Sequence, residues 1–164
     1  MKQPYYEIDS IDKGILNCLL ADARTPFLEI ARKLNVSGGT VHQRVDKLKE
    51  AGVIYGSTLR VSCERLGLGV TVLLGIHLHK AQRIDETIQE LRSLPEIVEA
   101  YYTTGNYALF VKLHVPDIKG YHRFLVERLQ NIESIRFTES FICLDMPINR
   151  SINLQHGLQG LSQS

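Results

Sequence analysis

The stretch that decides the fold of the first third of the chain is SGGTVHQRVDKLKEA, residues 37–51. Its apolar side chains recur at the spacing that brings them to one face of an α-helix; they are Val41, Val45 and Leu48. Ser37 is a preferred N-cap residue, and Gly52 favours the left-handed conformation at which helices end. The stretch therefore predicts a helix with an apolar stripe on one side and polar side chains on the other.

Two shorter helices are predicted before this one. Asp9 or Ser10 can cap the first, whose apolar residues at helical spacing are Ile11, Ile15, Leu16, Leu19 and Leu20. Thr25 is predicted as the N-cap of the second, with Pro26 at its first position. The inward side chains of that second helix are Ile30, Ala31 and Leu34. Three short helices joined in this way are typical of a helix-turn-helix.

The polar side of residues 37–51 suits entry into a DNA major groove about 12 Å wide. Its outward residues are Gly39, Thr40, His42, Gln43, Asp46 and Lys47. Gln43 and His42 can bond to base edges, and Gln43 can make two hydrogen bonds to an adenine. Gly38 and Gly39 in the first turn let backbone N–H groups approach a phosphate, which the helix N-terminus also favours.

Positive charge gathers in the same region. Six basic side chains stand against two acidic ones between residues 24 and 49, although the whole chain has a formal charge of only +1. This local excess indicates an anion-facing surface. Arg44 lies near the edge of the apolar stripe, so it either bridges to a phosphate or braces the helix. The candidate DNA-contacting residues are Arg24, Arg32, Lys33, Ser37, Gly38, Gly39, Thr40, His42, Gln43, Arg44, Lys47 and Lys49. A three-helix bundle that binds proteins through its basic face is the alternative.

The pattern changes to that of strands from Val70 on. Residues 70–78 alternate between apolar and other side chains, which is the period of a strand with one buried face. Gly105 and Asn106 are predicted to form a two-residue hairpin turn. Further helices are predicted over 85–93 and from Asp117, and further strands over 97–104, 107–115 and 135–144. The helix from Asp117 is predicted to turn Ile118, Tyr121, Leu125 and Leu129 inward. The order β-α-β-β-α-β in one antiparallel sheet is the ferredoxin-like arrangement, and the chain is therefore α+β.

Two helices can cover only one face of such a sheet. The other face is predicted to carry Leu73, Tyr101, Phe110 and Phe137, or their neighbours one position along the strands. A face so apolar is not suited to water and indicates burial against a partner. The sequence therefore predicts an obligate dimer formed sheet against sheet, from which larger assemblies can be built.

The chain of 164 residues is predicted to divide into a helix-turn-helix domain, a linker, a ferredoxin-like domain and a flexible tail, over 1–61, 62–69, 70–154 and 155–164. Strand character is also predicted for 53–55 and 58–61. Its three cysteines are far apart and lack C-x-x-C spacing, which argues against a disulfide framework. No apolar run approaches the ~20 residues of a membrane span, and the start lacks the apolar region of a secretory signal, so we expect a cytoplasmic protein.

Several segments together carry a family likeness: residues 8–16, 22–25, 29–31, 36–45 and 48–54 in the first part, and 99–107 in the second. With these segments the chain resembles the Lrp/AsnC family of bacterial and archaeal transcription regulators, and its AsnC branch most. The likeness runs from about Ile8 to Leu154. One departure is the pair Ser37-Gly38, because many members have Ser-Pro in this turn.

The resemblance implies a sequence-specific regulator of double-stranded DNA, associated with the nucleoid, with a C-terminal ligand-sensing domain called the RAM domain. It also implies dimers, commonly assembled as octamers of four dimers, and a small amino-acid effector bound between neighbouring dimers, with asparagine as the best guess. The effector-binding residues that it implies are Tyr102, Thr103, Thr104, Gly105, Asn106 and Tyr107, with Gln130 and Thr138 as partners from an adjacent subunit. Backbone N–H groups at Gly105 suit a carboxylate. A plain tight hairpin is the alternative for this loop.

No catalytic residue, metal or cofactor is expected. His77 and His79 share one face of a strand, but no third ligand lies close to them in the sequence. Two alternatives to a DNA-binding regulator remain. One is a sirohaem decarboxylase of the same architecture, in which His77, His79 and His122 would serve the tetrapyrrole chemistry. The other is a sensor module that never touches DNA.

Overall fold

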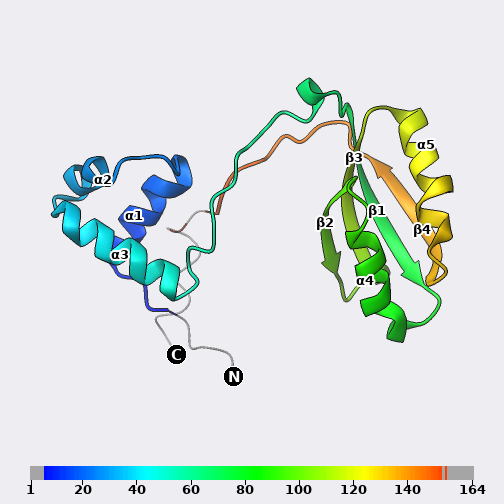
Figure 1. Ribbon diagram of the computed structural model, residues 1–164, viewed down its shortest axis with the longest axis horizontal. Coiled ribbons are helices and arrows are strands. Elements are labelled where there is room, and N and C mark those ends of the chain that lie inside the picture. The colour runs from blue at the N-terminus through cyan, green and yellow to red at the C-terminus, as the bar shows by residue number, and fades with distance from the viewer. Residues whose placement is uncertain (1–5, 153, 155–164) are drawn as a thin grey trace. The chain divides into compact units, whose positions relative to one another are not determined.

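The computed structural model describes residues 6–152 and residue 154. Within them the chain divides into two compact units. The residues up to Leu59 and those from Ile148 on form the first unit, and Arg60–Pro147 form the second. The first unit is helical and the second is built on a sheet (Figure 1).

Three helices form the first unit: α1 (Ser10–Ala21), α2 (Phe27–Leu34) and α3 (Gly38–Glu50). Asp9 caps α1 in a capping box, because its carboxylate accepts the Asp12 N–H while the Asp12 carboxylate accepts the Asp9 N–H. Ser37 caps α3 by accepting the Thr40 N–H at 3.0 Å. The buried cluster between the helices consists of Ile15, Ile30, Ala31, Val41 and Val45. The predicted helix-turn-helix is confirmed.

Two local predictions in this unit are wrong. Thr25 does not cap α2, because its hydroxyl donates to the Asp22 carbonyl at 2.8 Å, and Pro26 takes the N-cap position instead. The strand character predicted for 53–55 and 58–61 is absent from the described part of the chain, where Val53 lies in a bend and the other residues have no regular secondary structure. The predicted linker 62–69 contains a short 3₁₀-helix, η1 (Glu64–Leu66).

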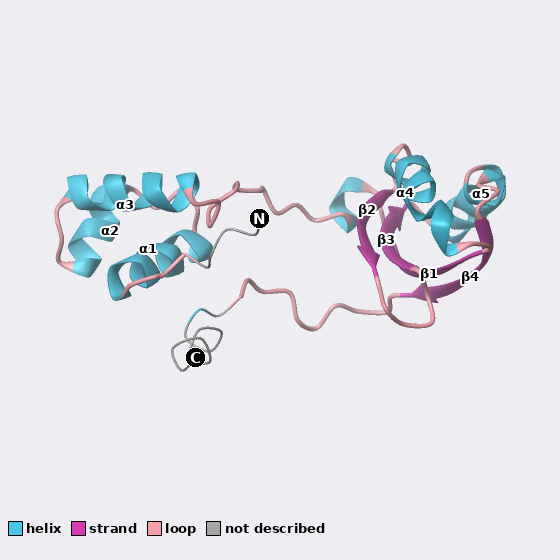
Figure 2. Cartoon of the chain, turned by 90° about the horizontal axis from the view of Figure 1, so that it is seen from below, coloured by secondary structure: helices cyan, strands magenta, loops and turns pink. Residues whose placement is uncertain are grey.

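The second unit is a four-stranded antiparallel sheet with helices on one face (Figure 2). Its elements in chain order are β1 (Val70–Leu78), η2 (Ala81–Arg83), α4 (Ile84–Arg92), β2 (Ile97–Tyr102), β3 (Leu109–Val115), α5 (Ile118–Glu127), η3 (Leu129–Asn131) and β4 (Ile135–Ile142). The strands lie in the order β2-β3-β1-β4, so the two middle strands of the sheet are β1 and β3. This is the predicted ferredoxin-like arrangement.

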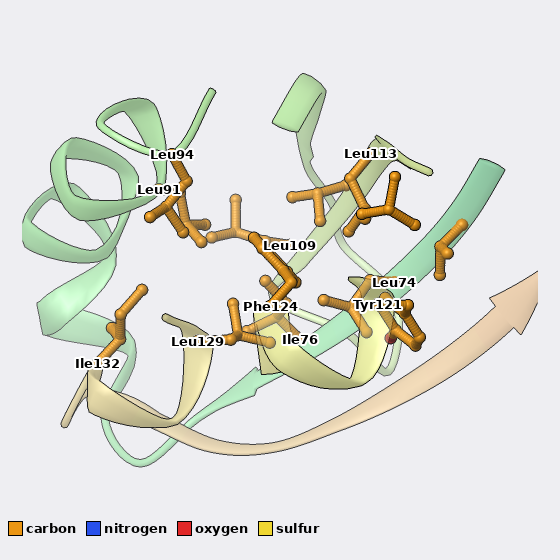
Figure 3. Packing of buried hydrophobic residues seen from close by; sticks show 13 residues of the cluster. Leu74, Ile76, Leu91, Leu94, Leu109, Leu113, Tyr121, Phe124, Leu129 and Ile132 are labelled. Atoms are coloured by element: carbon orange, nitrogen blue, oxygen red, sulfur yellow. The ribbon is translucent and has the colours of Figure 1, made fainter. Parts of the chain in front are cut away.

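The core of this unit lies between the sheet and its two long helices (Figure 3). Alternate residues of β1 and β3 point into it, including Val72, Leu74 and Ile76, which are all fully buried. The helices contribute Leu91, Tyr121 and Phe124. A sheet that is covered on this face alone leaves its opposite face open.

The second unit departs from the sequence predictions at two places. The connection between β2 and β3 spans residues 103–108, which is longer than the two-residue turn predicted at Gly105 and Asn106. Ile118, predicted to face inward, is 56% exposed, because the buried stripe of α5 runs through Tyr121 and Phe124.

The segment after β4 returns to the first unit. Leu154 is 8% exposed and packs with Leu16 of α1 and Leu48 of α3. The sequence assigned residues through 154 to the second domain, whereas those from Ile148 group with the first unit. The predicted flexible tail, 155–164, lies outside the described residues. No helix within the described residues is both long and apolar enough to span a membrane.

Candidate nucleic-acid interface and ligand loop

The outer face of α3 is exposed at most of its positions. Its buried stripe is confirmed, since Val41, Val45 and Leu48 are at most 2% exposed. The predicted contact residues Ser37, Gly39, His42, Gln43, Lys47 and Lys49 are exposed, and Gly38, Thr40 and Arg44 are partly buried. The helix therefore presents a polar side that a partner can reach.

The first turn of α3 is held in place by its own side chains. The Ser37 hydroxyl accepts the Thr40 N–H and lies 2.8 Å from the Thr40 hydroxyl. A Cβ added at Gly38 would meet Leu28 of α2 at 3.0 Å, so this glycine lets the two helices approach. A Cβ at Gly39 would meet nothing closer than the Ser37 hydroxyl at 3.7 Å, so this position stays open toward solvent.

Arg44 braces the bundle in this structure. Its guanidinium contacts the Asp9 carboxylate at 2.5 Å and the Asp12 carboxylate at 3.4 Å. Asp12 is only 1% exposed, so Arg44 compensates a buried charge. The Asp12 backbone N–H and the Arg44 side chain hold the pKa of Asp9 below its usual value. Of the two roles that the sequence left open for Arg44, the geometry favours the brace.

The other basic residues differ in how freely they can meet a phosphate. Arg24 and Arg32 are exposed, as are Lys47 and Lys49. Among the described residues no ion pair engages these four side chains. Lys33 is also exposed, but its ammonium contacts the Glu29 carboxylate at 2.8 Å, and this contact raises the pKa of Lys33.

His42 has a contact that sequence reasoning missed. Its ring meets the Phe27 ring edge to face, with centroids 4.6 Å apart. Phe27 opens α2, so this contact joins the two helices of the motif at the exposed surface. Spacing alone carries no signal for such a contact, because the two residues lie on different helices.

The loop between β2 and β3 is closed by hydrogen bonds across its base. The Thr103 N–H donates to the Ala108 carbonyl at 3.1 Å, and the Ala108 N–H donates to the Ile76 carbonyl of β1 at 2.9 Å. Thr104, Gly105 and Asn106 are exposed at the tip. Neither Gly105 nor Asn106 has a positive φ, so a tight two-residue hairpin does not explain these residue types.

The remaining predicted ligand residues are not gathered at this tip within one chain. Tyr102 is 70% exposed at the end of β2. Tyr107 points onto the open face of the sheet, where its ring lies 5.0 Å from the His77 ring. Gln130 is exposed in η3, and Thr138 is partly buried in β4, opposite Ile76.

The open face of the sheet is rich in aromatic side chains. The strand register places Leu73, Tyr101, Phe110 and Phe137 on it, as predicted. Tyr101, Phe137 and Phe141 are 54%, 48% and 41% exposed. Charged groups are interspersed, and one pair is the Lys112 ammonium and the Glu99 carboxylate at 3.2 Å. An exposed face of this composition is typical of an interaction surface.

His77 and His122 lie on different faces of the sheet. The His77 ring stacks on the Phe137 ring on the open face, with centroids 3.9 Å apart. His122 is exposed on α5, which covers the other face of the sheet. Among the described residues no three metal-ligating side chains come together. This arrangement separates His77 from His122, two of the three histidines that the tetrapyrrole alternative needs.

Comparison with known proteins covers both units. A family model described as "Lrp/AsnC ligand binding domain" matches residues 70–152, and one described as "Winged helix-turn-helix DNA-binding" matches residues 8–55. The chain is 42% identical over 147 residues to regulatory protein AsnC of Escherichia coli, which covers 90% of this chain and 97% of that protein. It is 38% identical over 128 residues to the HTH-type transcriptional regulator Ptr1 of Methanocaldococcus jannaschii, with 78% and 86% coverage.

Solved structures give the same result. The structure of E. coli AsnC matches with a TM-score of 0.85 and 41% identity, and the match covers 90% of this chain and 99% of that one. A transcriptional regulator from Neisseria meningitidis, solved as a complex with L-Met, matches with a TM-score of 0.86 over 92% of this chain and 99% of that one. Its identity is 20%, so this second match shows the fold alone.

Proposed function

Because the chain belongs to the Lrp/AsnC family and is a transcriptional regulator rather than an enzyme, we propose that it binds specific DNA sequences through α3 and responds to an amino acid held at the 102–107 loop. The observation that carries the DNA part is the two-sided character of α3. Its stripe is fully packed, and its opposite side is polar and exposed. A helix of this kind can enter the major groove without unfolding any part of the bundle.

The residues of this surface divide by role. Gln43 and Lys47 lie on the exposed side of α3, where they can reach base edges. Arg24, Arg32 and Lys49 anchor the bundle on phosphates and fix its register, without reading sequence themselves. Lys33 contributes less, since it has to release Glu29 first. Arg44 acts indirectly by holding α3 against the start of α1.

An amino-acid effector suits the chemistry of the loop. Threonine hydroxyls and the Asn106 amide offer both donors and acceptors, and Gly105 adds a backbone N–H without a side chain. The Neisseria regulator of the same fold was solved with L-Met, which supports an amino acid as the ligand class. Asparagine is the candidate to test first. The loop tip is exposed in one chain, so we place the ligand between neighbouring dimers, with Gln130 and Thr138 supplied by the adjacent subunit.

The open face of the sheet supports self-association as part of this proposal. Two copies of this face, packed together, would bury Tyr101, Phe137 and Phe141, which are exposed in a single chain. A dimer also presents two copies of α3 to two half-sites about one helical turn apart, or a multiple of it. We propose octamers of four such dimers, acting in the cytoplasm on the nucleoid.

The regulatory step is a shift between assemblies. An effector bound between dimers favours one arrangement only if its affinity for the two arrangements differs. The arrangement of dimers that the effector favours then sets how many pairs of α3 helices bind DNA at the same time.

Titration of amino acids against the purified protein, followed by DNA binding with and without each one, tests this proposal. We expect one amino acid to give a thermal shift and to change the apparent affinity for target DNA. No heat and no shift with any amino acid would remove the sensing part. No DNA binding at any salt concentration would leave a sensor module that does not touch DNA.

A further inference from the structure

Tyr107 is the last residue that the resemblance assigns to the ligand loop, and its side chain lies on the open face of the sheet. Its ring lies on the open face of the sheet, with centroid distances of 5.0 Å to His77, 5.9 Å to Phe110 and 6.5 Å to Phe141. Its hydroxyl donates to the Glu139 carboxylate of β4. Tyr107 is therefore part of the aromatic surface of the open face, where it contacts Glu139 and Phe141 of β4.

Gly75 in the middle of β1 leaves room for the Tyr107 ring on the open face. A Cβ added at Gly75 would lie 2.5–2.7 Å from three atoms of the Tyr107 ring, so the ring would have to shift to make room for it. Phe110 and Glu139 are its cross-strand neighbours on either side. A glycine within a strand often marks such a close approach. The ring of Tyr107 thus fills the place where β1 lacks a side chain.

The backbone of Tyr107 belongs to the loop at the same time. Its carbonyl accepts the Thr103 hydroxyl, and the next residue, Ala108, closes the loop through hydrogen bonds to Thr103 and to Ile76 of β1. One residue therefore has its backbone in the ligand loop and its side chain on the open face.

We infer that Tyr107 is a positioning residue that couples the conformation of the 103–108 loop to the open face of the sheet on which two copies pack. The inference rests on the proposed function, since it names how the ligand loop and the dimer face communicate. When a second copy covers the open face, the Tyr107 ring is fixed and the loop is held. When a ligand orders the loop, the Tyr107 ring is held in place, and the open face already has the conformation on which a second copy packs. Because such coupling is reciprocal, dimer formation and loop order change each other by the same factor.

Hydrogen exchange in matched variants tests the coupling. Tyr107→Phe removes the hydroxyl that donates to the Glu139 carboxylate. Tyr101→Phe is the matched control, because it removes another hydroxyl of the open face, which donates to the Glu99 carboxylate, outside the loop. We expect the Thr103 and Ala108 amides to exchange roughly three- to tenfold faster in Tyr107→Phe, the effect of one lost hydrogen bond. We expect no change at these amides in Tyr101→Phe. Gly75→Ala should accelerate them further, because it displaces the whole ring.

A second measurement runs in the opposite direction, from the loop to the face. Thr103→Val removes the hydroxyl that donates to the Tyr107 carbonyl and leaves the open-face residues Tyr107, Phe110 and Phe141 unsubstituted. We expect sedimentation to show weaker self-association in this variant, an effect that a purely local role of the loop would not produce. Equal exchange at Thr103 and Ala108 in the wild type, Tyr107→Phe and Gly75→Ala would overturn the inference. So would unchanged self-association in Thr103→Val. If the wild type does not self-associate at all, the dimer part of the proposed function fails, and the exchange rates still decide whether Tyr107 holds the loop.

Discussion

Raising the salt concentration from roughly 50 to 200 mM should weaken binding to target DNA by about 10³- to 10⁵-fold. Each copy of the chain offers exposed Arg24, Arg32 and Lys49 as phosphate contacts, and two copies would act together on a two-fold site. That number of cations corresponds to about six to ten neutralised phosphates, whose released counterions produce the salt dependence. Fluorescence anisotropy of a labelled target fragment over a salt series measures the slope.

Two lysines of the same bundle provide a matched comparison. Lys49→Ala should weaken binding to all sequences alike and reduce the salt slope by about one for each copy bound. Lys33→Ala should change the slope less, because the Lys33 ammonium is already paired with Glu29. An affinity that stays flat between the two salt concentrations would contradict the assignment of these cations to phosphates.

Phe141→Asp should dissociate the proposed sheet-against-sheet dimer. Phe141 is 41% exposed on the open face, opposite Leu73 of β1, so a partner sheet would enclose it. Truncating a central aromatic residue of an interface costs about 2 kcal/mol or more, and a two-fold interface uses the residue twice. The expected loss in the dimerisation constant is therefore about a thousandfold. The affinity for a DNA fragment with two half-sites should also fall, by about 10²- to 10⁴-fold, because a monomer contacts one half-site and no longer carries a second α3 to the other.

Ile118→Asp is the control for this change. Ile118 is also an exposed apolar residue, at 56%, but it lies on α5, which packs on the other face of the sheet. Sedimentation equilibrium should show a monomer for Phe141→Asp and wild-type association for Ile118→Asp. A Phe141→Asp protein that remains a dimer would place the interface elsewhere on the molecule.

The regular elements of both units could be predicted because their patterns are local. The apolar spacing in α3, the alternation in β1 and the caps at Asp9, Ser37 and Asp117 each depend on residues within a few positions of one another. The same patterns gave the face of the sheet on which Tyr101 and Phe137 lie. Fold class and the two faces of α3 therefore followed from the sequence.

Several other contacts lie beyond the reach of such local patterns, because they join residues that are distant in the chain. Arg44 pairs with Asp9 and Asp12, which lie more than thirty positions earlier in the chain, and helical spacing alone left its role open. Tyr107 was assigned to the ligand loop by resemblance, although its ring lies over Gly75 of another strand. One signal for this was available, because glycine in the middle of a strand is unfavourable unless something approaches it closely. Leu154 likewise packs against α1 and α3 across almost the whole length of the chain.

Selection of bound sequences from a random DNA pool, by the wild type and by Gln43→Ala, tests most directly whether the polar side of α3 reads DNA. We expect the wild type to enrich a two-fold motif with half-sites about one helical turn apart or a multiple of it. We expect Gln43→Ala to retain binding and to lose the preference at one position of each half-site. A wild-type protein that enriches no motif, or a Gln43→Ala protein that enriches the same motif as strongly, would contradict the assignment of α3 as the reading helix.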